Sequence, residues 1–169
     1  LKASTKVEYG DYEGALFDYK KLYDLPNLKR EIYHDIGLIR FHISDYSNAL
    51  LNFNKVIEGG KFNYRDLLIR GYINTKLRKY KSAKKDYDKS IQLNKKDYIS
   101  FNNRGVNNFK QSNFRGALDD FNRSIKLNPG NYNSFYNRAL TYNKLNSIKK
   151  ACRDLKKSIK LGKDVFKEE

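Results

Sequence analysis

Apolar and polar positions along the chain follow a helical rhythm that is interrupted at regular intervals. Large apolar residues recur three and four positions apart, which is the spacing of one face of an α-helix. The rhythm breaks at short pairs that favour turns and helix caps: Gly10-Asp11, Ser44-Asp45, Ser112-Asn113 and Asn146-Ser147. Arg78-Lys79 holds the corresponding place in one segment and is a weaker turn signal. The pattern predicts an all-α chain of short helices joined as antiparallel hairpins.

This pattern repeats every 34 residues over the whole chain. Alanine recurs at that spacing, as Ala15, Ala49, Ala83, Ala117 and Ala151. Self-similarity at a fixed period of this size predicts a stack of equivalent structural units. Four full units are predicted at residues 30–63, 64–97, 98–131 and 132–165, with a partial unit at 1–29 and a short tail to residue 169.

Two other positions of the unit explain how its helices pack. The eighth position is always small: Ala3, Gly37, Gly71, Gly105 and Ala139. The twenty-fourth is large and mostly aromatic: Tyr19, Phe53, Tyr87, Phe121 and Leu155. Small residues let two helix backbones approach each other, and aromatic rings fill the space beside them. Because one hairpin alone cannot bury its apolar face, the units are expected to stack on one another.

These positions resemble the tetratricopeptide repeat (TPR) family over essentially the whole chain. The resemblance implies a right-handed superhelix of antiparallel hairpins that acts as a protein–protein interaction scaffold. The eleventh position departs from the tyrosine usual in the family, since it holds Arg40, Asn74 and Asn108, and only Tyr142 conforms.

The seventh and twenty-third positions vary together. Where the seventh is basic the twenty-third is Asp, as in Lys2 with Asp18, Arg70 with Asp86, Arg104 with Asp120, and Arg138 with Asp154. The unit at 30–63 has Ile36 and Asn52 instead. We interpret these pairs as ion pairs between the two helices of each hairpin. As partly exposed pairs they are expected to contribute about 0–1 kcal/mol each.

The resemblance also implies where a partner binds. In the family the first helices of successive hairpins line a concave groove that accepts a peptide. Carried over by position, the groove residues are His34, Leu38, Phe41, Arg65, Leu68, Tyr72, Lys76, Asn102, Val106, Phe109, Lys110, Tyr136, Leu140, Asn143 and Lys144. Aromatic anchors with nearby amides favour peptide recognition. The lysines at Lys76, Lys110 and Lys144 favour an acidic or mixed apolar and acidic ligand.

Charge supports an alternative function. The net charge is +16, yet residues 1–63 hold nine basic and nine acidic side chains, so the whole excess lies in residues 64–169. A basic ridge is predicted along the second helices, formed by Lys21, Lys55, Lys84, Lys85, Lys89, Arg123, Lys149, Lys150, Lys156, Lys157 and Lys160. Such a ridge could bind nucleic acid or an anionic membrane. A compositional bias toward lysine explains the charge equally well.

The sequence gives little support for catalysis. His34 and His42 lie too far apart on one helix to chelate a metal directly, and Cys152 is expected to be a packed thiol. We therefore expect a non-enzyme without cofactor or metal. No apolar run approaches the roughly 20 residues of a membrane-spanning helix. The chain begins with Leu1 rather than Met, which leaves its compartment open. Leu155 and Ile159 have little to cover them, so end-to-end self-association is a further hypothesis.

Overall fold

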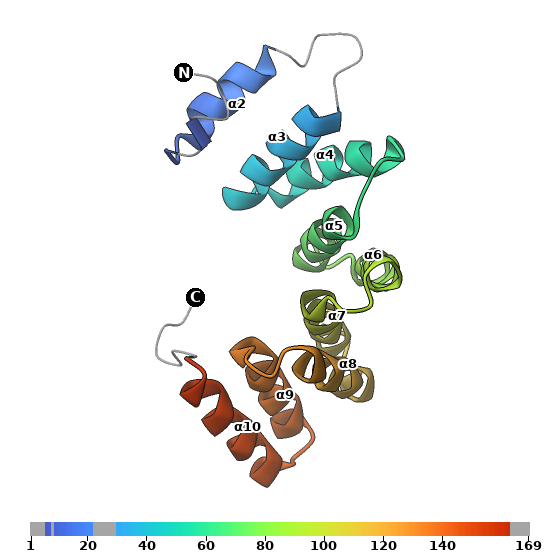
Figure 1. The fold of residues 1–169 in the computed structure, drawn as a ribbon, viewed down its shortest axis with the longest axis vertical. Coiled ribbons are helices and arrows are strands. Elements are labelled where there is room, and N and C mark those ends of the chain that lie inside the picture. Colours follow the sequence, from blue (N-terminus) through green and yellow to red (C-terminus); the bar gives the residue numbers. More distant parts are fainter. Residues whose placement is uncertain (1–5, 8, 22–29, 163–169) are drawn as a thin grey trace. The chain divides into compact units, whose positions relative to one another are not determined.

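The computed structural model describes residues 6–7, 9–21 and 30–162. All regular secondary structure in these ranges is helical, as predicted (Figure 1). The helices are α2 (Tyr12–Lys20), α3 (Arg30–His42), α4 (Tyr46–Glu58), α5 (Tyr64–Lys76), α6 (Tyr80–Leu93), α7 (Tyr98–Lys110), α8 (Phe114–Leu127), α9 (Tyr132–Lys144) and α10 (Ile148–Lys160).

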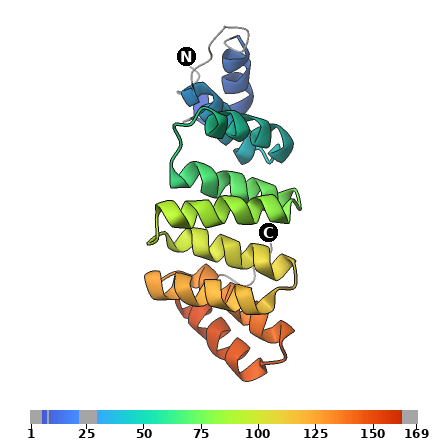
Figure 2. The same ribbon diagram turned by 90° about the vertical axis from the view of Figure 1, so that its right-hand side faces the viewer.

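The chain forms two compact units, residues 1–79 and 80–169. In the first, α3 and α4 form a hairpin, with α2 against α3 and α5 against α4. In the second, α7 with α8 and α9 with α10 form two hairpins, and α6 packs on α7. Within each unit, consecutive helices run side by side (Figure 2). The division between the units falls inside the predicted repeat 64–97.

The turns between paired helices share one geometry. Ser44, Arg78, Ser112 and Asn146 all have positive φ angles, between 54° and 61°. In the first of these turns the Asp45 amide donates to the Arg40 carbonyl (2.8 Å) and the Ser44 amide to the Phe41 carbonyl (3.0 Å). This pair of bonds is a Schellman motif, which satisfies the last carbonyls of a helix. Arg78 adopts the same backbone conformation, although its sequence is the weaker turn signal.

The repeated small and aromatic positions form the core, as the sequence predicts. Ala15, Ala49, Ala83 and Ala117 are fully buried. A Cβ atom added at Gly105 would lie 2.6 Å from the ring of Phe121, so only glycine lets these two helices approach this closely. Ala151 is half-buried, because no described hairpin follows α10.

Several sequence expectations need a correction or fall outside the description. Lys2 and Ala3 lie outside the described residues. Asp18 pairs with Lys6 at 2.7 Å. Cys152 is exposed rather than packed, since the face of α10 that carries it has no described helix over it. Leu155 and Ile159 are exposed for the same reason. Among the described residues, no helix has both the length and the apolar character needed to cross a bilayer.

Candidate functional site

In the first unit, three of the predicted groove residues meet in an aromatic cluster. The rings of Phe41 on α3 and Tyr72 on α5 meet edge to face, with centroids 5.4 Å apart. Lys76 Nζ lies 5.3 Å from the Tyr72 ring centroid and 6.0 Å from that of Tyr46 on α4. Leu38 packs against the buried core beside them. The cluster therefore offers an aromatic surface with a cation at its edge.

His34, also predicted for the groove, takes part in a buried ionic cluster instead. Its Nε2 lies 3.3 Å from Oδ1 of Asp66, whose side chain is 1% exposed. Asp66 Oδ2 accepts from Arg30 Nη2 (2.6 Å) and from the Asn63 backbone amide (2.9 Å), which closes a capping box at the start of α5. Oδ1 is buried and accepts no hydrogen bond of good geometry from the described residues, and a protonated His34 Nε2, 3.3 Å away, is the donor that can satisfy it.

This cluster shifts the pKa of both titratable partners. The hydrogen bond that His34 donates to Asp66 raises the pKa of His34, with a smaller contribution from Asp35. Burial acts to raise the pKa of Asp66, yet the His34 hydrogen bond, the Asn63 amide and the Arg30 charge together lower it below its ordinary value. Each group therefore favours the charged form of the other.

The other two predicted groove residues of the first unit lie on α5. Arg65 is exposed, and its Nε donates to the Tyr64 hydroxyl at 3.1 Å. Leu68 is half-buried.

In the second unit, some predicted groove residues stabilise the packing of α7 against α9. Asn102 Oδ1 accepts from Asn137 Nδ2 (3.1 Å) and from the Ser134 hydroxyl (3.2 Å). Phe109 packs edge to face on Phe114 of α8, with centroids 5.5 Å apart. Asn102 and Phe109 thus contribute to the scaffold as well as to the predicted surface.

The remaining groove residues of this unit are accessible to a partner. Val106 and Tyr136 are half-buried, while Lys110, Leu140, Asn143 and Lys144 are exposed. No carboxylate among the described residues pairs with Lys110 or Lys144. Because α7 and α9 are in direct contact, equivalent positions on the two helices form one continuous surface. Sequence reasoning placed these side chains by position alone, and their role in binding stays a prediction.

Two of the predicted ion pairs form in the second unit, and the arginine of each also bonds to a residue outside the predicted pair. Arg104 Nη2 lies 2.6 Å from Asp120 Oδ1, and Arg138 Nε lies 2.6 Å from Asp154 Oδ2. Arg104 also bridges to Asp88 on the preceding second helix, with its Nη1 2.6 Å from Oδ1. The Asp120 and Asp154 side chains are both 6% exposed, so these pairs are more buried than the sequence predicts.

The same bridge to the preceding second helix recurs in neutral form. Arg138 donates to Asn122 (2.7 Å), and in the first unit Arg70 donates to Asn54 (3.2 Å). The arginine at the seventh position therefore joins successive hairpins as well as the helices of one hairpin. Polar residues at the twenty-fifth position (Asn54, Asp88, Asn122) were the sequence signal for this link.

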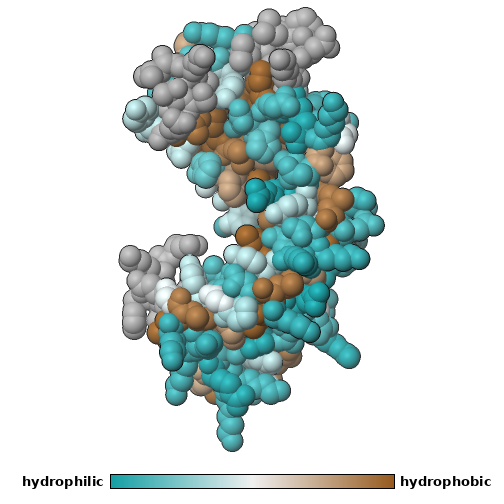
Figure 3. Space-filling view, in the orientation of Figure 1, coloured by the Kyte–Doolittle hydropathy of each residue, from teal (hydrophilic) through white to brown (hydrophobic). Residues whose placement is uncertain are grey.

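The predicted basic ridge is exposed along the second helices. All eleven of its residues are exposed. Several already have partners: Lys55 pairs with Glu58 (3.2 Å) and Lys84 with Asp88 (2.6 Å). On the face shown in Figure 3 the surface is mostly hydrophilic, and hydrophobic residues form separate patches. The described residues contain no group of three or more His, Cys, Asp and Glu side chains that could hold a metal.

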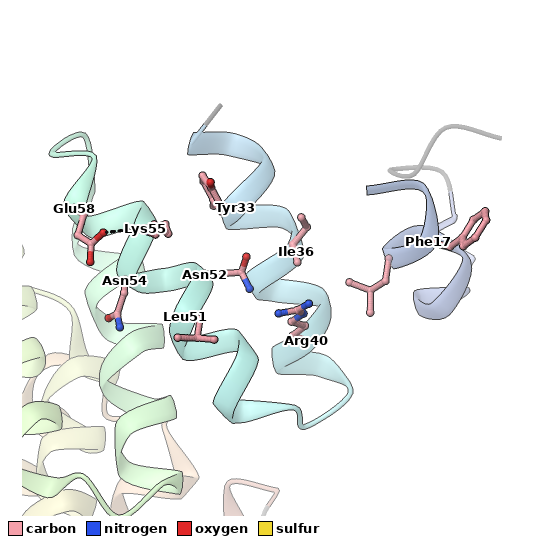
Figure 4. A pocket seen from close by; sticks show the side chains of 10 residues that line it. Phe17, Tyr33, Ile36, Arg40, Leu51, Asn52, Asn54, Lys55 and Glu58 are labelled. Atoms are coloured by element: carbon pink, nitrogen blue, oxygen red, sulfur yellow. Dashed lines mark hydrogen bonds and ion pairs between the residues drawn. The ribbon is translucent and has the colours of Figure 1, made fainter. Parts of the chain in front are cut away.

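Between α2 and the hairpin of α3 and α4, the first unit has a hollow of about 810 Å³. Leu16 of α2, Ile36 of α3 and Leu51 of α4 give it apolar walls. Arg40 and Asn52 also line it, and the Lys55–Glu58 pair lies at one side (Figure 4). Sequence reasoning noted Ile36 and Asn52 as exceptions to the ion-pair pattern but did not predict the hollow.

Comparison with known families adds independent support for the repeats. Models described as "Tetratricopeptide repeat" match residues 67–97 and 121–153. The first match falls within the predicted repeat 64–97. The chain is a tetratricopeptide repeat protein. Proteins of this family are scaffolds for protein–protein interaction, and the helices and buried alanines described above have that architecture.

Solved structures show the same fold. YrrB, a TPR protein described as having an unusual peptide-binding site, is 24% identical, with a TM-score of 0.80 over 96% of this chain and 84% of YrrB. A structure of MamA is 19% identical, with a TM-score of 0.85 over 94% and 93% of the two chains. MamA from Desulfovibrio magneticus RS-1 is 16% identical, with a TM-score of 0.87 over 94% and 90%. None of the curated proteins matches this TPR chain in sequence.

Proposed function

We propose that this TPR protein binds an acidic, partly apolar protein segment on the surfaces of its first helices. The observation that carries the proposal is the surface of α7 and α9. There Lys110 and Lys144, one repeat apart, are exposed and have no carboxylate partner among the described residues. Leu140 is 39% exposed beside them. Cations next to apolar side chains fit a segment that alternates acidic and apolar residues.

The first unit supports the same mode of binding with a different surface. The Phe41–Tyr72 pair presents aromatic rings, which supply large contact area at small entropic cost. Lys76 lies at the edge of those rings. The peptide-binding site of YrrB agrees with a peptide ligand for a protein of this fold. A ligand that engages either unit would meet an aromatic or aliphatic anchor and a lysine.

Selection from a random displayed peptide library, followed by measured affinities of the enriched peptides, tests this proposal. Enriched sequences should carry Asp or Glu between apolar residues. Lys110→Glu with Lys144→Glu should weaken the best peptide about tenfold or more, because the two reversed charges would repel the acidic residues of that peptide. Tyr72→Ala tests the first unit in the same way. Enrichment of basic or purely neutral sequences would contradict the proposal.

The basic ridge supports a second candidate function, binding of a polyanion. Its exposed lysines on α6 and α10 are the observation in favour. Charge reversal of Lys89 and Lys157, which lie on the second helices, separates the two functions. A polyanion binder should lose affinity for a random-sequence DNA duplex on these changes and in proportion to added salt. A groove binder should keep its affinity for the selected peptide.

A further inference from the structure

The hollow between α2 and the α3–α4 hairpin lies beside Ile36, at a repeat position that is an arginine in the second unit. In the second unit, Arg104 extends between α6 and α8 and bonds to Asp88 and Asp120, so its side chain occupies the space between successive second helices. Ile36 holds the same position in the hairpin 30–63. Ile36 is buried in a core cluster with Ala15 and Tyr19 of α2 and can make no ion pair there, and a hollow of about 810 Å³ lies beside it.

A cation lines this hollow without an internal partner. The guanidinium of Arg40 has no hydrogen bond or ion pair to any residue in the described ranges. In the hairpin 98–131 the eleventh position, which corresponds to Arg40, is Asn108. Its side-chain amide donates to Asp120 Oδ2 at 2.9 Å, so the eleventh position of that hairpin faces the twenty-third. In the hairpin 30–63 the twenty-third position is Asn52, whose amide donates to the Asn48 carbonyl at 2.8 Å. The carboxylate that meets an arginine in the two hairpins 98–131 and 132–165 is therefore absent here.

We infer that this hollow binds a small organic acid with an apolar body. The apolar body would lie against Leu16, Ile36 and Leu51, and the carboxylate would bond to Arg40. The ligand would thus supply the acidic group that Asp120 and Asp154 supply in the second unit. Guanidinium and carboxylate groups form paired, charge-assisted hydrogen bonds, which give both orientation and affinity.

The dimensions and surroundings of the hollow fit such a ligand. Its volume lies within the roughly 300–1,000 Å³ of sites that enclose small molecules. The nearby cation Lys55 already pairs with Glu58 at 3.2 Å, which leaves Arg40 as the lining cation that no described carboxylate neutralises. The hollow and the aromatic cluster of the proposed peptide surface both use α3 and α4, but none of the residues that line the hollow belongs to the cluster of Phe41, Tyr46, Tyr72 and Lys76. The two proposals are therefore independent.

Titration of the chain with octanoate, followed by NMR chemical shifts, tests the inference. Shifts should move at residues of α2, α3 and α4 that line the hollow. Octanol, with the same carbon chain and no charge, should bind about tenfold more weakly, because it lacks the charged hydrogen bond to Arg40. Equal affinity for octanoate and octanol, or no octanoate binding, would overturn the inference.

Three variants locate the site. Arg40→Gln should weaken octanoate about tenfold and leave octanol unchanged, whereas Arg115→Gln, at an exposed arginine of the second unit, should change neither. Ile36→Arg with Asn52→Asp introduces the ion pair of the second unit and places a longer, charged side chain at the wall of the hollow. This double variant should keep its helical circular dichroism and lose binding of both probes. Octanoate binding that survives in the double variant would place the site elsewhere and refute the inference.

A comparison with a peptide distinguishes two ligands that carry a carboxylate: a small organic acid and the C-terminus of a protein. A short peptide that ends in leucine with a free carboxylate is compared with octanoate on the same chain. Octanoate binding that the Arg40→Gln change weakens supports the inference, whatever the peptide does. Binding of the peptide alone would contradict the small-molecule ligand and assign the hollow to protein termini.

Discussion

In both units the same two repeat positions join successive hairpins, but the side chains at those positions differ. In both, the fifth position of one hairpin contacts the third position of the next. In the first unit these residues are His34 and Asp66, which form a buried ionic contact with Arg30. In the second they are Asn102 and Ser134, joined by a neutral hydrogen bond of 3.2 Å. The repeat therefore fixes which positions meet, and the side chains decide whether the contact responds to pH.

The twenty-seventh position shows the same difference. In the second unit the Ser124 hydroxyl bonds to Ser134 (2.7 Å) and to the Tyr98 carbonyl (2.8 Å). The first unit has buried Val56 at the equivalent place, which can make no such bond. A neutral hydroxyl pair and an ionic cluster can both join hairpins. They differ in how much stability is lost when one partner is removed. A buried charge left unpaired costs far more than a hydroxyl left unpaired.

The largest expected effect follows from that inequality. Asp66→Ala should destabilise the first unit by about 3 kcal/mol, because it leaves Arg30 and His34 without their carboxylate and removes the capping box. Ser134→Ala should destabilise the second unit by about 1 kcal/mol. Urea unfolding, followed by NMR signals from α3 and α9, reads each unit separately. Equal losses in the two variants would contradict the comparison.

Glycines at the eighth position give a smaller contrast. At Gly105 an added Cβ would lie 2.6 Å from the fully buried Phe121 ring, and at Gly37 it would lie 3.0 Å from Phe53. Overpacking costs about 1–3 kcal/mol, and alanine gains about 1 kcal/mol in helix propensity. Gly105→Ala should therefore be destabilising by about 1–2 kcal/mol, and Gly37→Ala nearly neutral. The same urea titrations measure both, and a larger loss at Gly37 would show that the Phe121 ring can move aside.

The smallest effect is a pH dependence confined to the first unit. Because the folded pKa of His34 is raised, its contribution is fully present below about pH 6.5 and is lost as the pH rises through the folded value. Asp66, Asp35 and Arg30 are the charged groups around it. The signals of α3 should thus unfold at lower urea at pH 8.5 than at pH 6, while those of α9 change less. His34→Gln should abolish the difference, and its persistence there would assign the titration to another group.

The sequence predicts the architecture because one period runs through every hairpin. The buried alanines and Gly105 against Phe121 follow directly from positions 34 residues apart. The turn at Arg78 adopts the common geometry despite its weak local signal, since the repeat on both sides requires it. Tertiary packing thus decides a backbone conformation that the local residues favour only weakly.

The sites were harder to predict, because each depends on a departure from the repeat. His34 matches a groove position, yet it faces Asp66, and a carboxylate at the third position occurs in this unit alone. The hollow lies beside Ile36, where the repeat departs from arginine, and a pattern of positions does not show empty space. The second contact of Arg104, with Asp88, joins different hairpins, whereas the ion-pair prediction compared positions within one hairpin.

The central claim is that partners bind to the first helices rather than the second. Hydrogen exchange of the chain, with and without the strongest peptide from the displayed library, tests it most directly. The account predicts slower amide exchange on binding in α3 and α5 or in α7 and α9, with α4, α6, α8 and α10 nearly unchanged. Protection confined to α4, α6, α8 and α10 would contradict it.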